Sequence, residues 1–473
     1  MKRLGVLLAV AAAFLALPPT AVAQETAPTV VVGTFLDDQP TVHDPTARYT
    51  LYLPVGFDAS QRHPVLLIFD PRGRARLAAE LFRPAADRFG WILVSSNDTR
   101  SDGEWEPNRK AIAALWPEVH YLNGADPRRL YAAGFSGGAI VAWVLAQATH
   151  EIAGIVSVGG RLPPEVATDR IEFVHWGAAG GWDFNLTEMR KIEELLERSG
   201  VPHRLEIFDG PHSWCSPELA EQAIGWMELH AMRRELRPRD PDLISTLWDE
   251  DVARAEALEA AGDLVAAERR WRAIADTFDG LHDVTSAVSA ATRIGSMHEF
   301  ETAERAQRRA DAADERFIRE RLPLLTAMGV RDQPITVARL RRELDIDRLL
   351  EESAGDGPES VAARRMLHRV STQASFYLPR EFMTHGRWRE AETSLEIAVL
   401  ADPDAAPYVW YNLACAASRM GHLDRALEAL GEAVERGFAD ADHARADPDL
   451  ETLRSSPEHG PKVSALFPRH DVQ

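Results

Sequence analysis

The sequence predicts an α/β domain built on a mostly parallel sheet, followed by an all-helical region. From about residue 29 to 235, short apolar runs alternate with helical patterns. Several of these runs are continuous rather than alternating, as in strands that are covered on both faces. After residue 243 strand patterns nearly vanish, and Ala, Leu, Glu and Arg recur with a period near 3.6 residues. The charged, proline-containing stretch LRPRDPDL at 236–243 separates the two regions.

The expected strands and helices alternate through the first region. Strands are expected at TVVVGTF, RYTLYLPV, PVLLIFD, WILVSSN, RLYAAGF, IAGIVSVGG, EFVHWGA and RLEIF. Helices are expected at 74–88, 106–123, 138–149, 187–199 and 216–233. This alternation is typical of βαβ units, whose helices cover both faces of a sheet.

The helical region contains an internal repeat. A glycine followed by small or apolar residues at fixed offsets occurs three times: Gly262, Ala267, Trp271 and Ile274; Gly386, Ala391, Leu395 and Ala398; Gly421, Ala426, Leu430 and Ala433. Such spacing lets antiparallel helices approach closely and stack, and it resembles the tetratricopeptide repeat. Trp410, Leu413 and Ala414 match the first helix of that repeat, whereas Pro379 should break or delay a helix. Generic Ala-rich helical hairpins are the alternative.

The N-terminus predicts export. Lys2 and Arg3 precede an apolar run that ends at Leu17, and small residues at 21–23 offer a cleavage site before Gln24. The run is short for a membrane span, so we expect a secreted or periplasmic protein with no membrane span in the mature chain. The 473 residues are expected to divide into a signal peptide at 1–23, a domain that contains the predicted sheet at 24–238, a helical region with a TPR-like hairpin at 239–360 and TPR-like repeats at 361–473.

Composition excludes several classes of partner and cofactor. A net charge of -20 without a basic patch argues against nucleic acid. Cys215 and Cys415 lie in different expected domains and in apolar surroundings, so we expect buried free thiols rather than a disulfide. The sequence has no HExxH, no paired CxxC and no P-loop, which predicts neither a metal site nor a cofactor.

Residues 134–138, GFSGG, fit the G-x-S-x-G pattern between an expected strand and an expected helix. A nucleophilic serine at such a turn needs glycines around it, because the turn is tight and strained. It also needs a base and an acid. Asp183 in GGWDFN and His212 in GPHSW each follow a later strand. The order Ser, Asp, His at the carboxyl ends of strands predicts a catalytic triad of Ser136, Asp183 and His212.

Each of these residues also has a plainer interpretation. Ser136 would be a turn serine, Asp183 a helix N-cap and His212 an ordinary histidine. Asp209 and Asp70 are alternative acids. Asp209 lies only three residues from His212, and Asp70 is expected to shape the loop after its strand.

With these motifs, residues 45–235 resemble the α/β-hydrolase superfamily, specifically esterases like the polyhydroxybutyrate depolymerases and feruloyl esterases. The resemblance is carried by GFSGG, the Asp of GGWDFN and the His of GPHSW, and it implies serine esterase chemistry. Those esterases often have a His-Gly pair after the third strand, where this chain has Asp70-Pro71-Arg72-Gly73. Since proline has no N–H, the oxyanion donors are expected to be the backbone amides of Arg72 and Gly137.

The sequence therefore favours an exported serine hydrolase that cleaves small-molecule or polymer esters through an acyl-enzyme. A catalytically degenerate hydrolase fold that binds proteins is one alternative, and a serine peptidase on the same triad is another. The helical repeats would dock a protein partner or pack structurally against the hydrolase domain. Trp105, Trp182 and Trp214 are expected near the site, as packing or as binding surfaces.

Overall fold

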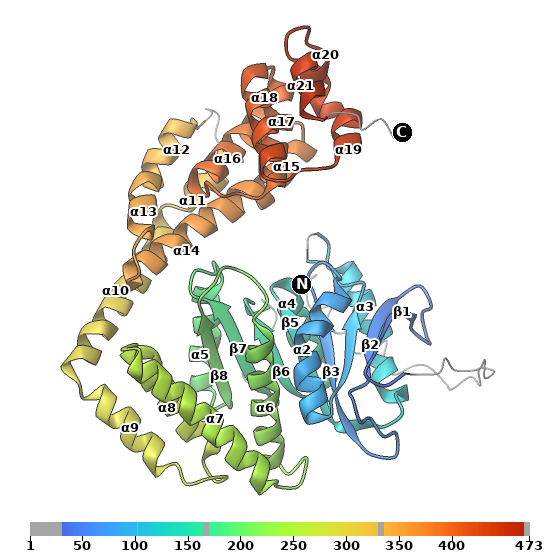
Figure 1. Cartoon of the computed structure of the whole chain (residues 1–473), viewed down its shortest axis with the longest axis vertical. Helices are drawn as coiled ribbons and strands as arrows, with labels where there is room; N and C mark the ends of the chain where they lie inside the picture. Colours follow the sequence, from blue (N-terminus) through green and yellow to red (C-terminus); the bar gives the residue numbers. More distant parts are fainter. Residues whose placement is uncertain (1–30, 102, 164–169, 330–334, 468–473) are drawn as a thin grey trace, which may run out of the picture. The chain divides into compact units, whose positions relative to one another are not determined.

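The computed structural model describes residues 31–101, 103–163, 170–329 and 335–467. The expected signal peptide lies outside these ranges. The chain divides into two compact units, one ending at Glu304 and the other beginning at Arg305, within helix α10 (His298–Glu320) (Figure 1). None of the helices in the described ranges is both long enough and apolar enough to cross a membrane.

Eight strands form one sheet in the described part of the first unit, in the order β1-β2-β4-β3-β5-β6-β7-β8. Strand β2 runs antiparallel to β1 and β4, and the other pairs are parallel. This strand order is that of the α/β-hydrolase fold, which confirms the predicted fold class. The strands are β1 (Phe35–Pro40), β2 (Arg48–Tyr52), β3 (His63–Phe69), β4 (Ile92–Ser96), β5 (Ala125–Phe135), β6 (Ile152–Val158), β7 (Val174–Gly180) and β8 (His203–Phe208).

Helices cover both faces of the sheet, as the continuous apolar runs predict. Strand β3 is buried at every position, with Leu67 in the core cluster of one face and Leu66 in that of the other. One face packs against α3 (Glu106–Tyr121), α4 (Gly137–Thr149) and α5 (Leu186–Arg198). The other packs against α2 (Ala75–Phe89) and α6 (Pro217–Arg233) (Figure 1).

The first strand differs from its prediction. The described residues of TVVVGTF before Phe35 form turns, and the strand is FLDDQP at 35–40. Strand β1 pairs only with β2, and its register is irregular between Leu36 and Gln39. An edge strand is half exposed and often charged, so apolar content alone misplaces it.

Three helices beyond the predicted boundary at 238 belong to the same unit as the sheet, which corrects the predicted domain limit. They are α7 (Pro241–Ala260), α8 (Leu264–Phe278) and α9 (Thr285–Gly295). The proline-containing stretch does break the helix, because α7 begins at Pro241 with the Asp240 side chain accepting the N–H of Leu243. However, Met232 near the end of α6 packs in one core with Trp248 of α7. The stretch is therefore a turn within a unit rather than a linker between units.

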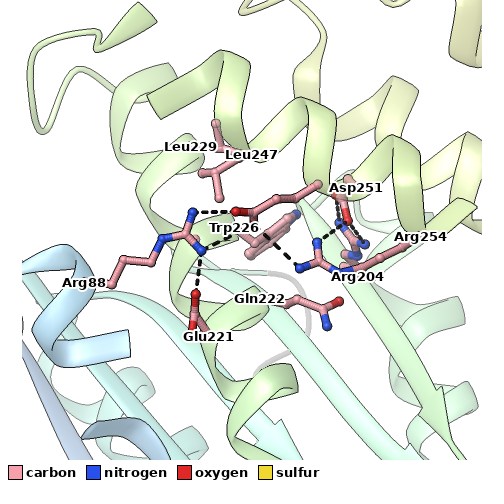
Figure 2. A pocket seen from close by; sticks show the side chains of 11 residues that line it. Arg88, Arg204, Glu221, Gln222, Trp226, Leu229, Leu247, Asp251 and Arg254 are labelled. Atoms are coloured by element: carbon pink, nitrogen blue, oxygen red, sulfur yellow. Dashed lines mark hydrogen bonds and ion pairs between the residues drawn. The ribbon is translucent and has the colours of Figure 1, made fainter. Parts of the chain in front are cut away.

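A buried ion network joins α7 and α8 to strand β8. Arg204 on β8 donates to both carboxylate oxygens of Asp251 on α7, at 2.8 and 3.1 Å, and to Glu206 at 2.5 Å. Arg270 on α8 donates to Asp251 at 3.0 Å and to Glu206 at 2.6 Å. Figure 2 shows Arg204 pointing toward Asp251 beside a pocket between α6 and α7. Two arginines thus neutralise two carboxylates where water has little access.

The described part of the second unit is entirely helical. Residues of the predicted repeat positions, including Ala391, Leu395, Ala426 and Leu430, have no exposed surface. A π-helical turn at Gln373–Tyr377 precedes Pro379, so the proline interrupts the helix as predicted. The elements are α11 (Pro323–Thr326), η1 (Ala327–Gly329), α12 (Val337–Glu343), α13 (Ile346–Ser353), α14 (Pro358–Thr372), α15 (Leu378–Thr384), α16 (Trp388–Ala401), α17 (Pro407–Met420), α18 (Leu423–Glu435), α19 (Ala441–Ala446), η3 (Pro448–Leu450), α20 (Glu451–Ser455) and α21 (Gly460–Leu466).

Both cysteines are buried and free, as predicted. Cys215 lies in the first unit and Cys415 in the second. Burial raises the pKa of Cys215 to about 12, so its thiol stays protonated at neutral pH.

Candidate active site

Ser136 lies at the sharp turn between β5 and α4. Its backbone has φ 54° and ψ -119°, a combination that costs an L-residue conformational energy. A Cβ on Gly134 would lie 2.1 Å from the carbonyl oxygen of Gly138, and one on Gly138 would lie 1.9 Å from that of Phe69. Both positions therefore require glycine, and the turn holds a partly exposed serine at the carboxyl edge of the sheet.

Asp183 and His212 come together, although 29 residues separate them. His212 Nδ1 lies 2.9 Å from Asp183 Oδ1. The Asp183 side chain is fully buried, and that of His212 is 13% exposed. Asp183 Oδ1 also accepts the backbone N–H of Asn185 at 2.7 Å, so the acid serves the start of α5 as well. The predicted contact with His212 is present, whereas the plainer interpretation of Asp183 is wrong, because the N-cap of α5 is Asn185.

The imidazole of His212 lies between two aromatic rings. Its centroid is 4.6 Å from that of Phe135 and 4.2 Å from that of Phe184. Phe135 directly precedes Ser136, so the ring lies beside the serine turn. The described residues contain no hydrogen bond between Ser136 Oγ and the imidazole. Such bonds are often long in the absence of substrate and shorten when it binds.

Gly159, at the end of β6, leaves room for this pair. A Cβ there would lie 2.6 Å from Asp183 Oδ2 and 3.0 Å from His212 Nδ1. Neither Gly159 nor Phe184 is predicted from the sequence to have a role at the site. The glycine pair of VSVGG after an expected strand is the available signal for the first, whereas a ring contact such as that of Phe184 leaves no local pattern.

The two expected oxyanion donors differ in their surroundings. Gly137 is the first residue of α4, so its N–H has no acceptor within the helix and lies at the positive end of the helix dipole. The Arg72 N–H donates to Asp70 Oδ1 at 2.9 Å. Asp70 and Arg72 form an Asx turn, and in this structure that turn engages the Arg72 amide instead of leaving it directed toward a substrate oxygen.

The alternative acids lie elsewhere. Asp209 is exposed, and within the described ranges it makes no hydrogen bond to His212. Asp70 is buried in the loop after β3 and binds Arg74 and Trp214. Trp214 therefore packs and donates a hydrogen bond, whereas Trp105 lies at the start of α3 against the core.

One further group of polar side chains lies in the second unit. Asp424, Glu458 and His459 each place a potential metal-binding atom within 4.8 Å of the others. Both ring nitrogens of His459 already have partners, Ser456 Oγ at 3.0 Å and Asp424 at 3.0 Å. Local hydrogen bonds thus account for this group without an ion.

Comparisons with known proteins cover parts of the chain. No family model matches it. A chloroplastic protein from Arabidopsis thaliana is 38% identical over 84 residues, which is 17% of this chain and 25% of that protein. The match thus spans a quarter of that relative's length.

Similar solved structures include esterases. A ferulic acid esterase has 16% identity and a TM-score of 0.35 over 41% of this chain and 97% of its own. A hyperthermophilic esterase from Pyrobaculum calidifontis has 15% identity and a TM-score of 0.36 over 49% and 91%. An S-formylglutathione hydrolase from Staphylococcus aureus has 14% identity and a TM-score of 0.34 over 42% and 99%. Identities and TM-scores this low do not assign a function to this chain. The fold is assigned from the strand order of the sheet.

Proposed function

We propose that this chain is an exported serine hydrolase that cleaves carboxylic esters through an acyl-enzyme on Ser136. The observation that carries the proposal is the 2.9 Å contact between His212 Nδ1 and a fully buried Asp183, beside a serine held at φ 54°. A buried carboxylate on one ring nitrogen orients the imidazole and stabilises the positive charge that it gains as a base.

In the proposed mechanism, His212 Nε2 takes the proton from Ser136 Oγ as that oxygen attacks the ester carbonyl carbon. The Gly137 N–H stabilises the resulting oxyanion, a contribution of about 3 kcal/mol. His212 then gives the proton to the leaving alcohol, and an activated water releases the acyl group. For the Arg72 amide to act as the second donor, its N–H must exchange Asp70 Oδ1 for the substrate oxygen.

A fluorophosphonate probe tests this proposal, because it labels only an activated serine. The probe should label the wild-type chain at Ser136, and Ser136→Ala should abolish labelling. Ser101→Ala is the matched control, since a Cβ on Gly137 would lie 2.2 Å from Ser101 Cβ, which makes Ser101 a neighbouring serine. An unlabelled wild-type chain would leave the degenerate binding module as the better description. Hydrolysis of peptide anilides but not of p-nitrophenyl esters would favour a peptidase.

The same proposal includes export and a docking role for TPR-like repeats. Burial of small residues at the repeated positions supports stacked helical hairpins. N-terminal sequencing of the exported chain should begin at Gln24. Immobilised residues 305–473 should retain a protein partner that immobilised residues 31–304 do not retain. Retention by neither would favour a structural role for the helices.

A further inference from the structure

Asp70 accepts an unusual number of hydrogen bonds for one buried carboxylate. It has no exposed surface. Its Oδ1 accepts the backbone N–H of Arg72 at 2.9 Å, that of Arg74 at 3.2 Å and Nε of Arg74 at 3.0 Å. Its Oδ2 accepts Nη2 of Arg74 and Nε1 of Trp214, both at 2.9 Å. All five groups are donors, so the site is shaped for a charged carboxylate.

These contacts join three loops at the carboxyl edge of the sheet. Asp70 itself begins the loop after β3, which also contains Arg72. Its carbonyl oxygen accepts Oγ1 of Thr99, in the loop after β4, at 2.8 Å. Trp214 belongs to the loop after β8 and lies two residues beyond His212. Because β5, β6 and β7 separate β3 from β8, this last loop must extend across the edge to reach Asp70.

Packing connects the Trp214 contact to His212. The Trp214 indole lies 5.6 Å from the ring of Phe135 and 6.0 Å from that of Phe82 on α2. Phe135 also contacts the imidazole, at 4.6 Å. A shift of the Trp214 indole would therefore displace the ring of Phe135, which contacts the imidazole of His212 and directly precedes Ser136.

We propose that Asp70 and Trp214 are positioning residues, whose hydrogen bond holds the loop of His212 against the loop after β3. The inference rests on the proposed function. Neither residue takes part in a bond-making step. Their contact fixes the position of His212 Nε2 relative to Ser136 Oγ, and proton transfer depends steeply on that position. Its loss should lower kcat while leaving KM nearly unchanged.

Two substitutions separate this role from simple packing. Trp214→Phe keeps an aromatic ring but removes the N–H. Asp70→Asn keeps the size of the side chain but replaces one acceptor oxygen with an NH2 donor. In place of Oδ1 this NH2 group would face three N–H donors, and in place of Oδ2 it would face two. Trp176→Phe is the matched control. Trp176 is fully buried in β7, and its Nε1 has no hydrogen-bond partner in the described ranges.

The experiment measures kcat, KM, the rate of fluorophosphonate labelling and the melting temperature of full-length variants. We expect Trp214→Phe to lower kcat and the labelling rate about tenfold, and Asp70→Asn to lower them about 10²-fold. Trp176→Phe should lower the melting temperature but not kcat. If Asp70→Asn fails to fold, Trp214→Phe decides. Wild-type kcat in Trp214→Phe would overturn the inference, whereas an unlabelled wild-type chain would overturn the proposed function instead.

Discussion

Replacing Asp251 with alanine removes the carboxylate that two buried arginines share. Arg204 and Asp251 have side-chain exposures of only 5% and 9%. In the variant, the guanidinium groups of Arg204 and Arg270 would share Glu206 as their carboxylate partner. Leaving a buried charge without its partner costs about 3–5 kcal/mol. At about 2 °C per kcal/mol for a unit of this size, the melting temperature of the first unit should fall by about 6–10 °C.

The Glu250→Ala variant is the control for this prediction. Glu250 also lies on α7 and pairs with Arg88 of α2, but both side chains are about 30% exposed, and Arg88 keeps Glu221 as a second partner. Its loss should cost about 0–1 kcal/mol. Calorimetry gives the melting temperatures, and hydrogen exchange of peptides from β8 and α7 assigns the transition to the first unit. If the two variants melt within 2 °C of each other, the network does not hold α7 and α8 in place.

Three further predictions concern the site, the pH dependence and the extent of the first unit. Asp183→Asn should lower kcat by about 10⁴-fold at an unchanged melting temperature, because the neutral amide neither stabilises the imidazolium nor enforces the tautomer with its proton on Nδ1; a variant with more than a tenth of wild-type kcat would remove Asp183 from the mechanism. Burial alone would raise the pKa of Asp251, but Arg204 and Arg270 outweigh burial and hold it at about 2, below the ordinary 3.8. The stabilisation that ionised Asp251 provides is therefore complete above about pH 4 and is lost as the pH falls toward 2. The urea midpoints of the wild type and Asp251→Ala should converge between pH 5 and pH 2.5, and a constant difference between the two midpoints would contradict this. A fragment that ends at residue 238 should aggregate in size-exclusion chromatography because α6 loses its cover, whereas one that ends at residue 304 should stay monomeric.

The fold could be predicted because its signals are local. Continuous apolar strands and the glycines around Ser136 can be seen in short windows of sequence. The order of Ser136, Asp183 and His212 follows because each lies directly after an expected strand. In β3 every residue is buried, so its composition had to be apolar. Pro379 likewise interrupts a helix through the geometry of its own ring.

The missed features depend on distant partners. Trp214 and Asp70 are 144 residues apart, and neither has a pattern around it that points to the other. Arg204, Glu206 and Asp251 resemble ordinary surface charges until β8 and α7 are placed together, which is why the first unit extends beyond the predicted boundary. The Asx turn of Asp70 is a local motif, but its competition for the Arg72 amide is visible only in three dimensions.

Both outer strands of the sheet are protected from pairing with another chain. At β8, Arg269 of α8 donates to the carbonyl oxygen of Leu205 at 3.1 Å and so occupies an acceptor that a foreign strand would need. At β1, adjacent aspartates and the irregular register disfavour extension of the ladder. Pairing of another chain with either edge strand is therefore disfavoured. Aggregation through β8 or β1 should first require unfolding of α8 or of β1 itself.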